Sequence, residues 1–438
     1  MVDKTRDAVM KADDTFEFAF AAAPAKRDTL RLPLAQQLAA FHEFGTATRQ
    51  TRTQARLSSG GNVTVPTYVN EFWTAKQRAA HSLHEISYRA CFKPQLPRFF
   101  IQRLTDPGEV VYDPFMGRGT TPLEAALLSR VPAGCDVNPL SAFLTAPRLQ
   151  PPTLRQVEER LAQLDWRDHD EFPENLLVFY HPETLRELCA LKKYLRTRQA
   201  TGALEGVDRW LWMVGLNRLT GHSPGFFSVY TLPPNQATSV KAQRKINADR
   251  QQEPPRREVA VRIARKTRQL LRDCGAQVAA DLSRIAGRAL LLTGAADATP
   301  QLRAESVALV VTSPPFLDVV NYAQDNWLRC WFIGVDPASV ALTVPKELEE
   351  WQRAMTAVFR ELFRVVRRAG HVAFEVGEVR GGDIKLEEAV VPCGVAAGFQ
   401  PVLVLINDQK FTKTANCWGV DNNAKGTNTN RVVVFRKG

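Results

Sequence analysis

The chain has 438 residues, 45% of them hydrophobic and 24% charged, which is a normal globular composition with room for two or three domains. No apolar run is long enough to span a membrane and the N-terminal residues are too charged for a signal peptide, so we expect a soluble, cytoplasmic protein without a membrane partner. Seven cysteines with no C-x-x-C pair argue against a disulfide scaffold and against a bound metal. The net charge of +11 favours a polyanionic partner.

The pattern along the chain divides it into four segments. Residues 1–65 are charged and predict an N-terminal helical segment that ends in the flexible stretch SSGGN. In residues 66–150, an aromatic and basic run precedes a strand (VVYD), a glycine loop, a helix (TTPLEAALLSR) and a second strand (PAGCDVN), which form one βαβ-type unit. Residues 151–285 are mostly helical, and α/β texture returns in 286–438. We therefore predict one α/β sheet domain that is split by a helical insertion.

The loop DPFMGRGTT, residues 113–121, lies where a strand ends and a helix begins. Gly117 and Gly119 allow a tight turn and a close approach to a ligand, and Thr120 and Thr121 can cap the helix. The spacing fits neither a P-loop, whose lysine is missing, nor the G-x-G-x-x-G loop of dinucleotide sites. The loop is thus predicted to bind another kind of ligand.

Carboxylates at the strand ends indicate which ligand this is. Asp113 precedes the loop, where it would repel pyrophosphate but could bind an ammonium group. Asp136 ends the next strand, a place where carboxylates typically bind ribose hydroxyls. S-adenosylmethionine carries both groups, and Asp297, after a later strand, would lie near its adenine.

Three motifs resemble those of a known family, the amino-group DNA methyltransferases, which modify N4 of cytosine or N6 of adenine. These motifs are DPFMGRGTT, GCDVNPLS and, further on, TSPPF. HSLHEISYRACFKP, FRELFRVVRRAGHVAFEVGE and FTKTANCWGVDNNAKGTNTNR resemble flanking segments of the same family, although Cys91 stands where the family often has a lysine. The resemblance covers most of residues 81–143 and 289–435 and implies a Rossmann-like fold that depends on S-adenosylmethionine.

The strand-end acids and the resemblance together give the expected cofactor site. Its residues are Phe92, Pro94, Asp113, Pro114, Phe115, Gly117, Gly119, Thr120, Thr121, Asp136, Asn138 and Asp297.

The stretch Ser313-Pro314-Pro315-Phe316 corresponds to the family's catalytic loop. The Ser313 hydroxyl and the Pro314 carbonyl would accept the protons of an exocyclic amine, while Pro315 stiffens the loop and Phe316 stacks on a base flipped out of the duplex. In this family, serine at the first position usually goes with cytosine N4 and Asp or Asn with adenine. The resemblance therefore implies an N4-cytosine DNA methyltransferase, with N6-adenine methylation as the alternative.

The insertion is expected to recognise the DNA target. Residues 241–272 hold eleven Lys or Arg against three Asp or Glu, which favours contact with phosphates over a merely solvated helix face. Amide side chains in the preceding segment could read adenine edges or cap turns. The residues expected to contact DNA are Asn235, Gln236, Lys241, Arg244, Lys245 and Arg250.

Other functions compete with this one. An RNA base methyltransferase and a nucleic-acid-binding protein without catalysis both stay open, and a restriction endonuclease or defence system is a conceivable partner of the duplex-DNA enzyme. C5-cytosine methylation would need a nucleophilic cysteine. The Pro392-Cys393 pair lies too far along the chain for that role, and we expect Cys393 to be buried and inert.

Overall fold

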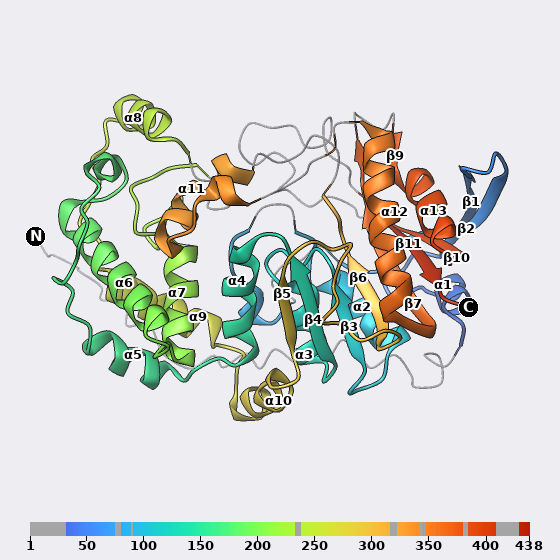
Figure 1. Cartoon of the computed structure of the whole chain (residues 1–438), viewed down its shortest axis with the longest axis horizontal. Helices are drawn as coiled ribbons and strands as arrows, with labels where there is room; N and C mark the ends of the chain where they lie inside the picture. The colour runs from blue at the N-terminus through green and yellow to red at the C-terminus, as the bar shows by residue number, and fades with distance from the viewer. Residues whose placement is uncertain are drawn as a thin grey trace, which may run out of the picture.

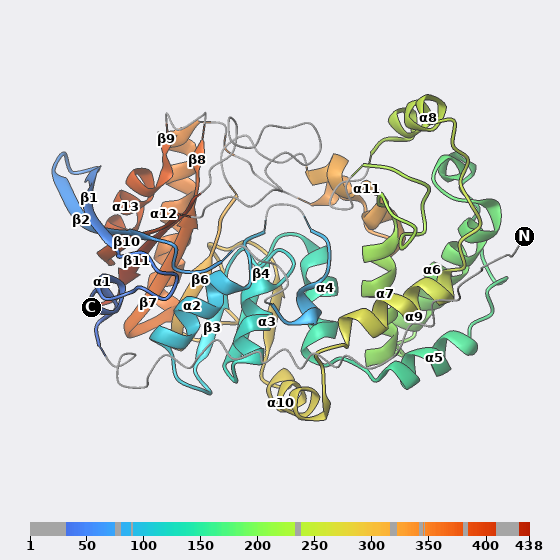
Figure 2. The same ribbon diagram turned by 180° about the vertical axis from the view of Figure 1, so that it is seen from behind.

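The computed structural model describes residues 32–74, 80–88, 91–232, 238–315, 322–340, 345, 347–379, 384–408 and 429–438. A domain built around a large sheet lies beside a part made mostly of helices (Figures 1 and 2). Within the described residues, no helix is both long and apolar enough to cross a membrane.

One nine-stranded sheet organises the larger domain, in the order β1-β2-β10-β11-β7-β6-β3-β4-β5. Strands β7, β6, β3, β4 and β5 run parallel, while β11 is antiparallel to both β7 and β10. The strands are β1 (Arg49–Arg56), β2 (Asn62–Asn70), β3 (Val110–Asp113), β4 (Val131–Asp136), β5 (Leu290–Thr293), β6 (Val307–Thr312), β7 (Val366–Val376), β10 (Gln400–Asp408) and β11 (Thr429–Arg436), with a separate pair β8 (Glu378–Val379) and β9 (Ile384–Lys385).

Strand order reverses at the centre of this sheet. From β3 the chain adds β4 and β5 on one side, and β6 and β7 on the other. In open α/β sheets, ligands bind beyond the carboxyl ends of the strands at such a point. A ligand site is therefore expected at the residues that follow β3 and β6.

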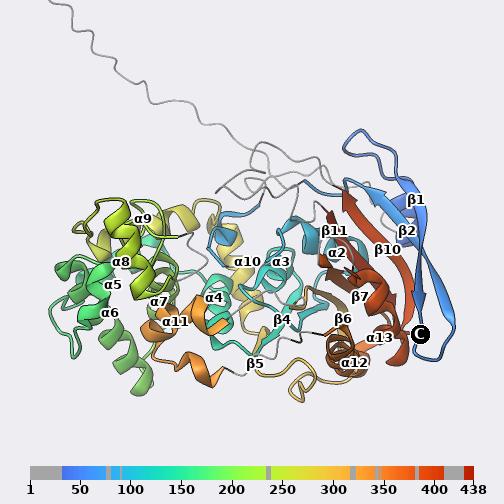
Figure 3. The same cartoon turned by 90° about the horizontal axis from the view of Figure 1, so that it is seen from above.

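Helices cover both faces of the sheet, with α2 and α3 on one side and α12 on the other (Figure 3). The central strand β6 is buried throughout, and its side chains point alternately to the two faces of the sheet. Val310 packs in the apolar cluster that contains the buried residues of α12 (the α12 cluster), whereas Leu309 and Val311 pack in the cluster that contains those of α2 (the α2 cluster). The helices are α1 (Leu34–Ala39), α2 (Gln95–Leu104), α3 (Thr120–Leu127), α4 (Pro139–Leu149), α5 (Leu154–Ala162), α6 (Pro182–Ala200), α7 (Gly206–Arg218), α8 (Val240–Asp249), α9 (Val259–Leu270), α10 (Ala276–Ala286), α11 (Tyr322–Ile333), α12 (Leu348–Val365) and α13 (Leu386–Ala396).

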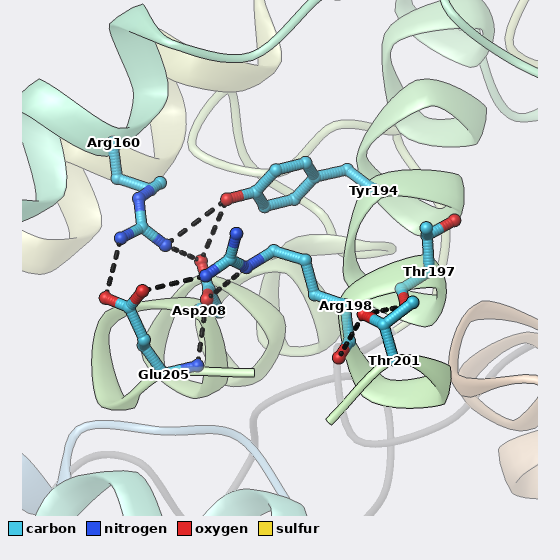
Figure 4. A network of polar contacts seen from close by, with 7 residues as sticks. All are labelled: Arg160, Tyr194, Thr197, Arg198, Thr201, Glu205 and Asp208. Atoms are coloured by element: carbon cyan, nitrogen blue, oxygen red, sulfur yellow. Dashed lines mark hydrogen bonds and ion pairs between the residues drawn. The ribbon is translucent and has the colours of Figure 1, made fainter. Parts of the chain in front are cut away.

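The helical insertion has its own packed core and polar network. Helices α5 to α10 occupy the chain between β4 and β5, as the helical pattern predicted, and α11 packs into the same apolar cluster. The Asp208 carboxylate is fully buried on α7 and accepts hydrogen bonds from Arg160 of α5 and Arg198 of α6, which also bind Glu205 (Figure 4). These ion pairs join three helices of the insertion. An α/β sheet domain with a mostly helical insertion is thereby confirmed.

One expectation for the N-terminal segment is wrong. Residues 49–56 and 62–70 form the antiparallel strands β1 and β2, and SSGGN lies at the hairpin turn between them. Exposed and buried side chains alternate with period two at Thr53, Ala55 and Val65, which is the pattern of a strand at a sheet edge. Because many residues of this segment are charged, the sequence alone did not reveal this alternation.

Candidate active site

The glycine loop joins the end of β3 to the start of α3. Gly117 (φ +50°) and Gly119 (φ +74°) both have left-handed backbone, which residues with side chains rarely adopt. A Cβ atom at Gly119 would also collide with Thr145 Oγ1 on α4, whereas one at Gly117 would make an ordinary 3.5 Å contact with the Tyr88 ring. Glycine is therefore required at position 117 by the backbone and at position 119 by both backbone and packing.

Asp113 joins the glycine loop to the catalytic strand. Its carboxyl group is 1% exposed, and Oδ1 accepts hydrogen bonds from the Phe115 main-chain nitrogen (3.1 Å) and the Thr312 hydroxyl (2.6 Å). Burial raises the pKa of Asp113 to about 7. Thr312 is the last residue of β6, so this carboxyl group holds the ends of two neighbouring strands together. Its contact with a cofactor ammonium group stays a prediction.

Asp136 and Asn138 order the neighbouring strand end. Asp136 accepts hydrogen bonds from the main-chain nitrogens of Gly117 (2.8 Å) and Asn138 (2.9 Å), and burial raises its pKa. Asn138 caps α4 and donates from its amide to the Tyr88 hydroxyl (2.8 Å). The acid predicted to bind ribose therefore also fixes the glycine loop, and its role toward ribose stays a prediction.

Tyr88 belongs to the upstream segment, residues 80–88, which lies against the glycine loop. Arg118, between the two glycines, is nearly buried and donates to the Ile86 carbonyl (2.9 Å). This bond holds the segment in place over the loop. Sequence reasoning identified the segment but missed Tyr88, because a single tyrosine carries no distinctive spacing.

The stretch expected to be catalytic begins directly after β6. Thr312 pairs with Phe374 of the adjacent strand β7, so Ser313 lies beside Glu375, a 7% exposed residue whose carboxyl group interacts with the Ser313 side chain. Asn430 Nδ2 donates to Glu375 Oε1 at 3.2 Å, and burial raises the pKa of Glu375 to about 7. The indole of Trp351 donates to the Pro315 carbonyl (2.9 Å) from α12, while Phe316 lies outside the described residues. Sequence reasoning missed both Glu375 and Trp351.

The other expected cofactor residues differ in their surroundings. Pro94 precedes α2 and is buried, and Phe92 is half-buried beside the α2 cluster. The Thr121 hydroxyl is buried and donates to the Val311 carbonyl (3.0 Å), so it braces α3 against β6. Asp297 is exposed beyond β5, and its contact with adenine stays a prediction. Pro114 and Thr120 are buried within the loop, and Phe115 is partly buried.

Four of the residues expected to contact DNA lie on α8 or directly after it, at one outer corner of the insertion (Figure 1). Lys241, Arg244 and Lys245 are exposed on this helix. The Arg250 guanidinium lies 3.8 Å from the centre of the Tyr230 ring. Asn235 and Gln236 fall outside the described residues. The cations of α8 are thus accessible to a partner, and DNA contact stays a prediction.

Cys393 is buried in α13, and burial raises its pKa to about 11. The expectation that this thiol is buried is confirmed, and its inertness stays a prediction. A nucleophilic role for this cysteine therefore has no support.

The comparison with family models decides which family shares this site. Residues 15–141 match the N6/N4 family described as DNA methylase, a range that contains the glycine loop and both strand-end acids, Asp113 and Asp136. Over this part of the chain, the sequence resembles the amino-group DNA methyltransferase family. The resemblance first noted in the motifs is thereby confirmed at the level of the family, while the choice between cytosine and adenine is not made by it.

Individual known proteins match the chain over stretches of very different length. The type II methyltransferase M.MjaII of Methanocaldococcus jannaschii is 28% identical over 101 residues, which are 23% of this chain and 18% of that protein's length. Among solved structures, a candidate DNA modification methylase of Thermus thermophilus is 22% identical, with 31% and 46% of the two chains covered and a TM-score of 0.20. The rRNA methyltransferase aviRa of Streptomyces viridochromogenes is 12% identical, with 84% and 94% covered and a TM-score of 0.32.

Proposed function

We propose that the protein transfers a methyl group from S-adenosylmethionine to the exocyclic N4 amine of a cytosine in duplex DNA. The observation that carries this proposal is the pair formed by Ser313 and Glu375 at the end of β6, next to the glycine loop. Thr312 and Asp113 connect the two strand ends through a 2.6 Å hydrogen bond. An acceptor for the substrate amine thus lies beside the residues expected to hold the cofactor.

The residues of the glycine loop suit S-adenosylmethionine chemically. Asp113 and Asp136 offer carboxylate oxygens for an ammonium group and for ribose hydroxyls, and the left-handed Gly117 lets the backbone come close to a ligand. Tyr88 closes this region from the upstream segment. When bound, the cofactor supplies an electrophilic methyl group.

Glu375 makes Ser313 a better acceptor. An exocyclic amine is a poor nucleophile because its lone pair is delocalised into the base, so acceptors must hold its protons and turn its lone pair toward the methyl group. The Ser313 hydroxyl has one proton, and while that proton is donated to Glu375 both oxygen lone pairs stay available for the amine. The proton that the amine loses on methylation can then pass through Ser313 to Glu375.

Trp351 constrains the second acceptor. Its indole is bonded to the carbonyl of Pro315, and two prolines fix the backbone before that bond, so the Pro314 carbonyl is held in one orientation. Rigid placement of acceptors lowers the entropy lost on reaching the reactive geometry. Serine at the first position supports cytosine over adenine, and the cations of the insertion support duplex DNA as the substrate.

The test is to incubate the protein with duplex DNA and methyl-labelled S-adenosylmethionine, digest the DNA, and weigh the nucleosides. N4-methylcytosine is the expected product. N6-methyladenine as sole product would instead assign the adenine reaction to the same scaffold, and label in RNA alone would overturn the DNA substrate. Ser313→Ala should lose roughly a hundredfold in rate while still folding. Ser306→Ala, at the opposite end of β6, is the matched control and should keep full activity.

A further inference from the structure

A basic pocket lies in the insertion, away from the glycine loop. Its volume is about 200 Å³, and it lies between the C-terminal end of α7, the loop at Pro224-Gly225 and one side of α9. Its polar lining is dominated by cations. The lining residues are Arg218, Pro224, Gly225, Val261, Arg262, Arg265, Lys266 and Gln269.

Three of the four cations of this pocket, Arg218, Arg262 and Lys266, have neutral hydrogen-bond partners. Among the residues that the structure describes, no carboxylate lies within 4.0 Å of their charged nitrogens. Lys266 Nζ donates to Gln269 Oε1 (3.0 Å), and Arg262 Nε donates to the Pro224 carbonyl (3.2 Å). Arg218 donates to the main-chain and side-chain oxygens of Asn217.

Other arginines of residues 241–272 do form ion pairs with carboxylates. Arg256 pairs with Glu187, Arg268 with Glu158 and Arg272 with Glu85. The charge of these arginines is thus neutralised within the chain. Inside the pocket, the cations form no ion pair within the part of the chain that the structure describes, although Lys266 is buried and Arg218 is half-buried.

Burying these cations without an ion pair costs free energy, and a bound anion would offset that cost. Lys266 is 6% exposed, and burial together with the nearby Arg218 lowers the pKa of Lys266 to about 7. Burial likewise lowers the pKa of Arg218. Buried charges are ordinarily paired, because an unpaired one loses its hydration without compensation. A cavity lined by such groups is therefore suited to an oxyanion with several acceptor oxygens.

We propose that this pocket binds one phosphate of a nucleic-acid backbone. The inference rests on the proposed function and adds to it a phosphate contact that is separate from α8. Arginine forks match the oxygens of a phosphodiester, and Lys266 adds a third donor group. The pocket also connects to the cofactor region, because Asn217 donates to the Ser87 carbonyl (3.2 Å), one residue before Tyr88.

The experiment measures the affinity of the full chain for a fluorescent DNA duplex, without cofactor, at several salt concentrations. Arg265→Gln is the main variant, because Arg265 is exposed and its loss leaves the fold intact; Lys266→Gln is the second. Each should weaken binding about tenfold or less at moderate salt and reduce the slope of log affinity against log salt by about one. Arg284→Gln removes an equally exposed arginine, paired with Asp281 on α10, and should change neither quantity.

A second arm separates the backbone from a free phosphate. If inorganic phosphate raises the melting temperature of the wild type but not of Arg265→Gln, while DNA affinity is equal in both, the pocket serves a free phosphate and the inference is overturned. An unchanged salt slope in both variants also overturns it. Because no methyl transfer is measured, a chain that binds DNA through this pocket but methylates nothing would contradict the proposed function alone.

Discussion

At the scale of single residues, Glu375 is the group whose chemistry depends most on its surroundings. It lies on β7 beside Ser313, and burial raises its pKa to about 7. Only the ionised carboxylate can accept the Ser313 proton, so the rate of methyl transfer should rise with pH through about 7. Glu375→Gln should lower kcat roughly tenfold to a hundredfold and flatten this rise, which a pH profile of kcat would show. An unaltered profile in the variant would contradict the role given to Glu375.

The same residue makes stability depend on pH. The pKa of Glu375 is higher in the folded chain than in an unfolded one, where it is near 4.5, so the native state binds more protons between these values. The contribution of Glu375 to the free energy of unfolding should therefore be largest below about pH 4.5 and should fall as the pH rises through 7, by up to roughly 3 kcal/mol. Asp113 acts in the same direction, because its pKa is also raised to about 7. Denaturant melts of wild type and Glu375→Gln should differ in this slope, and parallel curves would refute the assignment.

Only some residues of the candidate site could be predicted from the sequence. Asp113, Asp136 and Ser313 could be selected because each follows an apolar strand and carries a motif around it. Glu375 and Asn430 could not, since they lie 62 and 117 residues after Ser313 and meet it only through the pairing of β6, β7 and β11. An isolated Glu inside HVAFEVGEV has no local pattern that distinguishes it from a surface acid.

At the scale of elements, the two glycines of the loop before α3 should respond differently to substitution. Both have positive φ, so Gly117→Ala and Gly119→Ala each introduce backbone strain of about 1 kcal/mol. At Gly119 the new Cβ would also collide with Thr145, whereas at Gly117 it has room. Thermal denaturation should therefore show a clearly larger loss of stability for Gly119→Ala, and equal losses would disprove the packing argument. Gly108→Ala, also at positive φ but with open space around it, is the control for strain alone.

Helix α12 should control the catalytic stretch through one hydrogen bond. Trp351→Phe keeps most of the buried ring but removes the donor to the Pro315 carbonyl, which should lower kcat about tenfold while the melting temperature falls little. Trp212→Phe is the matched control, since Trp212 is also fully buried and its indole nitrogen has no hydrogen-bond partner among the described residues. If both variants lose activity equally, Trp351 acts only through packing.

Some helices and strands could be predicted from the sequence, and others could not. The βαβ unit around the glycine loop and the helical insertion followed from clear periodicity and turn residues. The hairpin β1–β2 was not predicted, because one of its faces is exposed and charged, so its apolar positions alternate too sparsely to be distinguished from a helix. The pairing of β2 with β10 stabilises those residues as strands, and such long-range contacts are absent from local patterns.

At the scale of the whole molecule, Asn407 links the β1–β2 hairpin to strand β10 of the sheet. Asn407 is fully buried in β10, and its side-chain oxygen accepts from the main-chain nitrogens of Phe72 (2.7 Å) and Trp73 (3.1 Å), just after β2. Asn407→Ala would leave two buried donors without a partner and should lower the free energy of unfolding by about 2–4 kcal/mol. Hydrogen exchange should quicken first in β1 and β2. Asn62→Ala, exposed on β2, should have no such effect, and slow exchange throughout the hairpin of Asn407→Ala would contradict this role.

The placement of the insertion between β4 and β5 has a consequence for the order of folding. These adjacent parallel strands are separated by more than 150 residues of chain, the longest connection between consecutive strands in the parallel part of the sheet. Loop closure loses entropy before any contact forms, whereas the helices of the insertion make mostly local contacts. We expect the insertion to gain protection early and β5 to join last, leaving the edge of β4 open until then. A folding chain would thus carry an unpaired strand edge until β5 joins, which makes the late arrival of β5 the step at which this protein is most prone to aggregate.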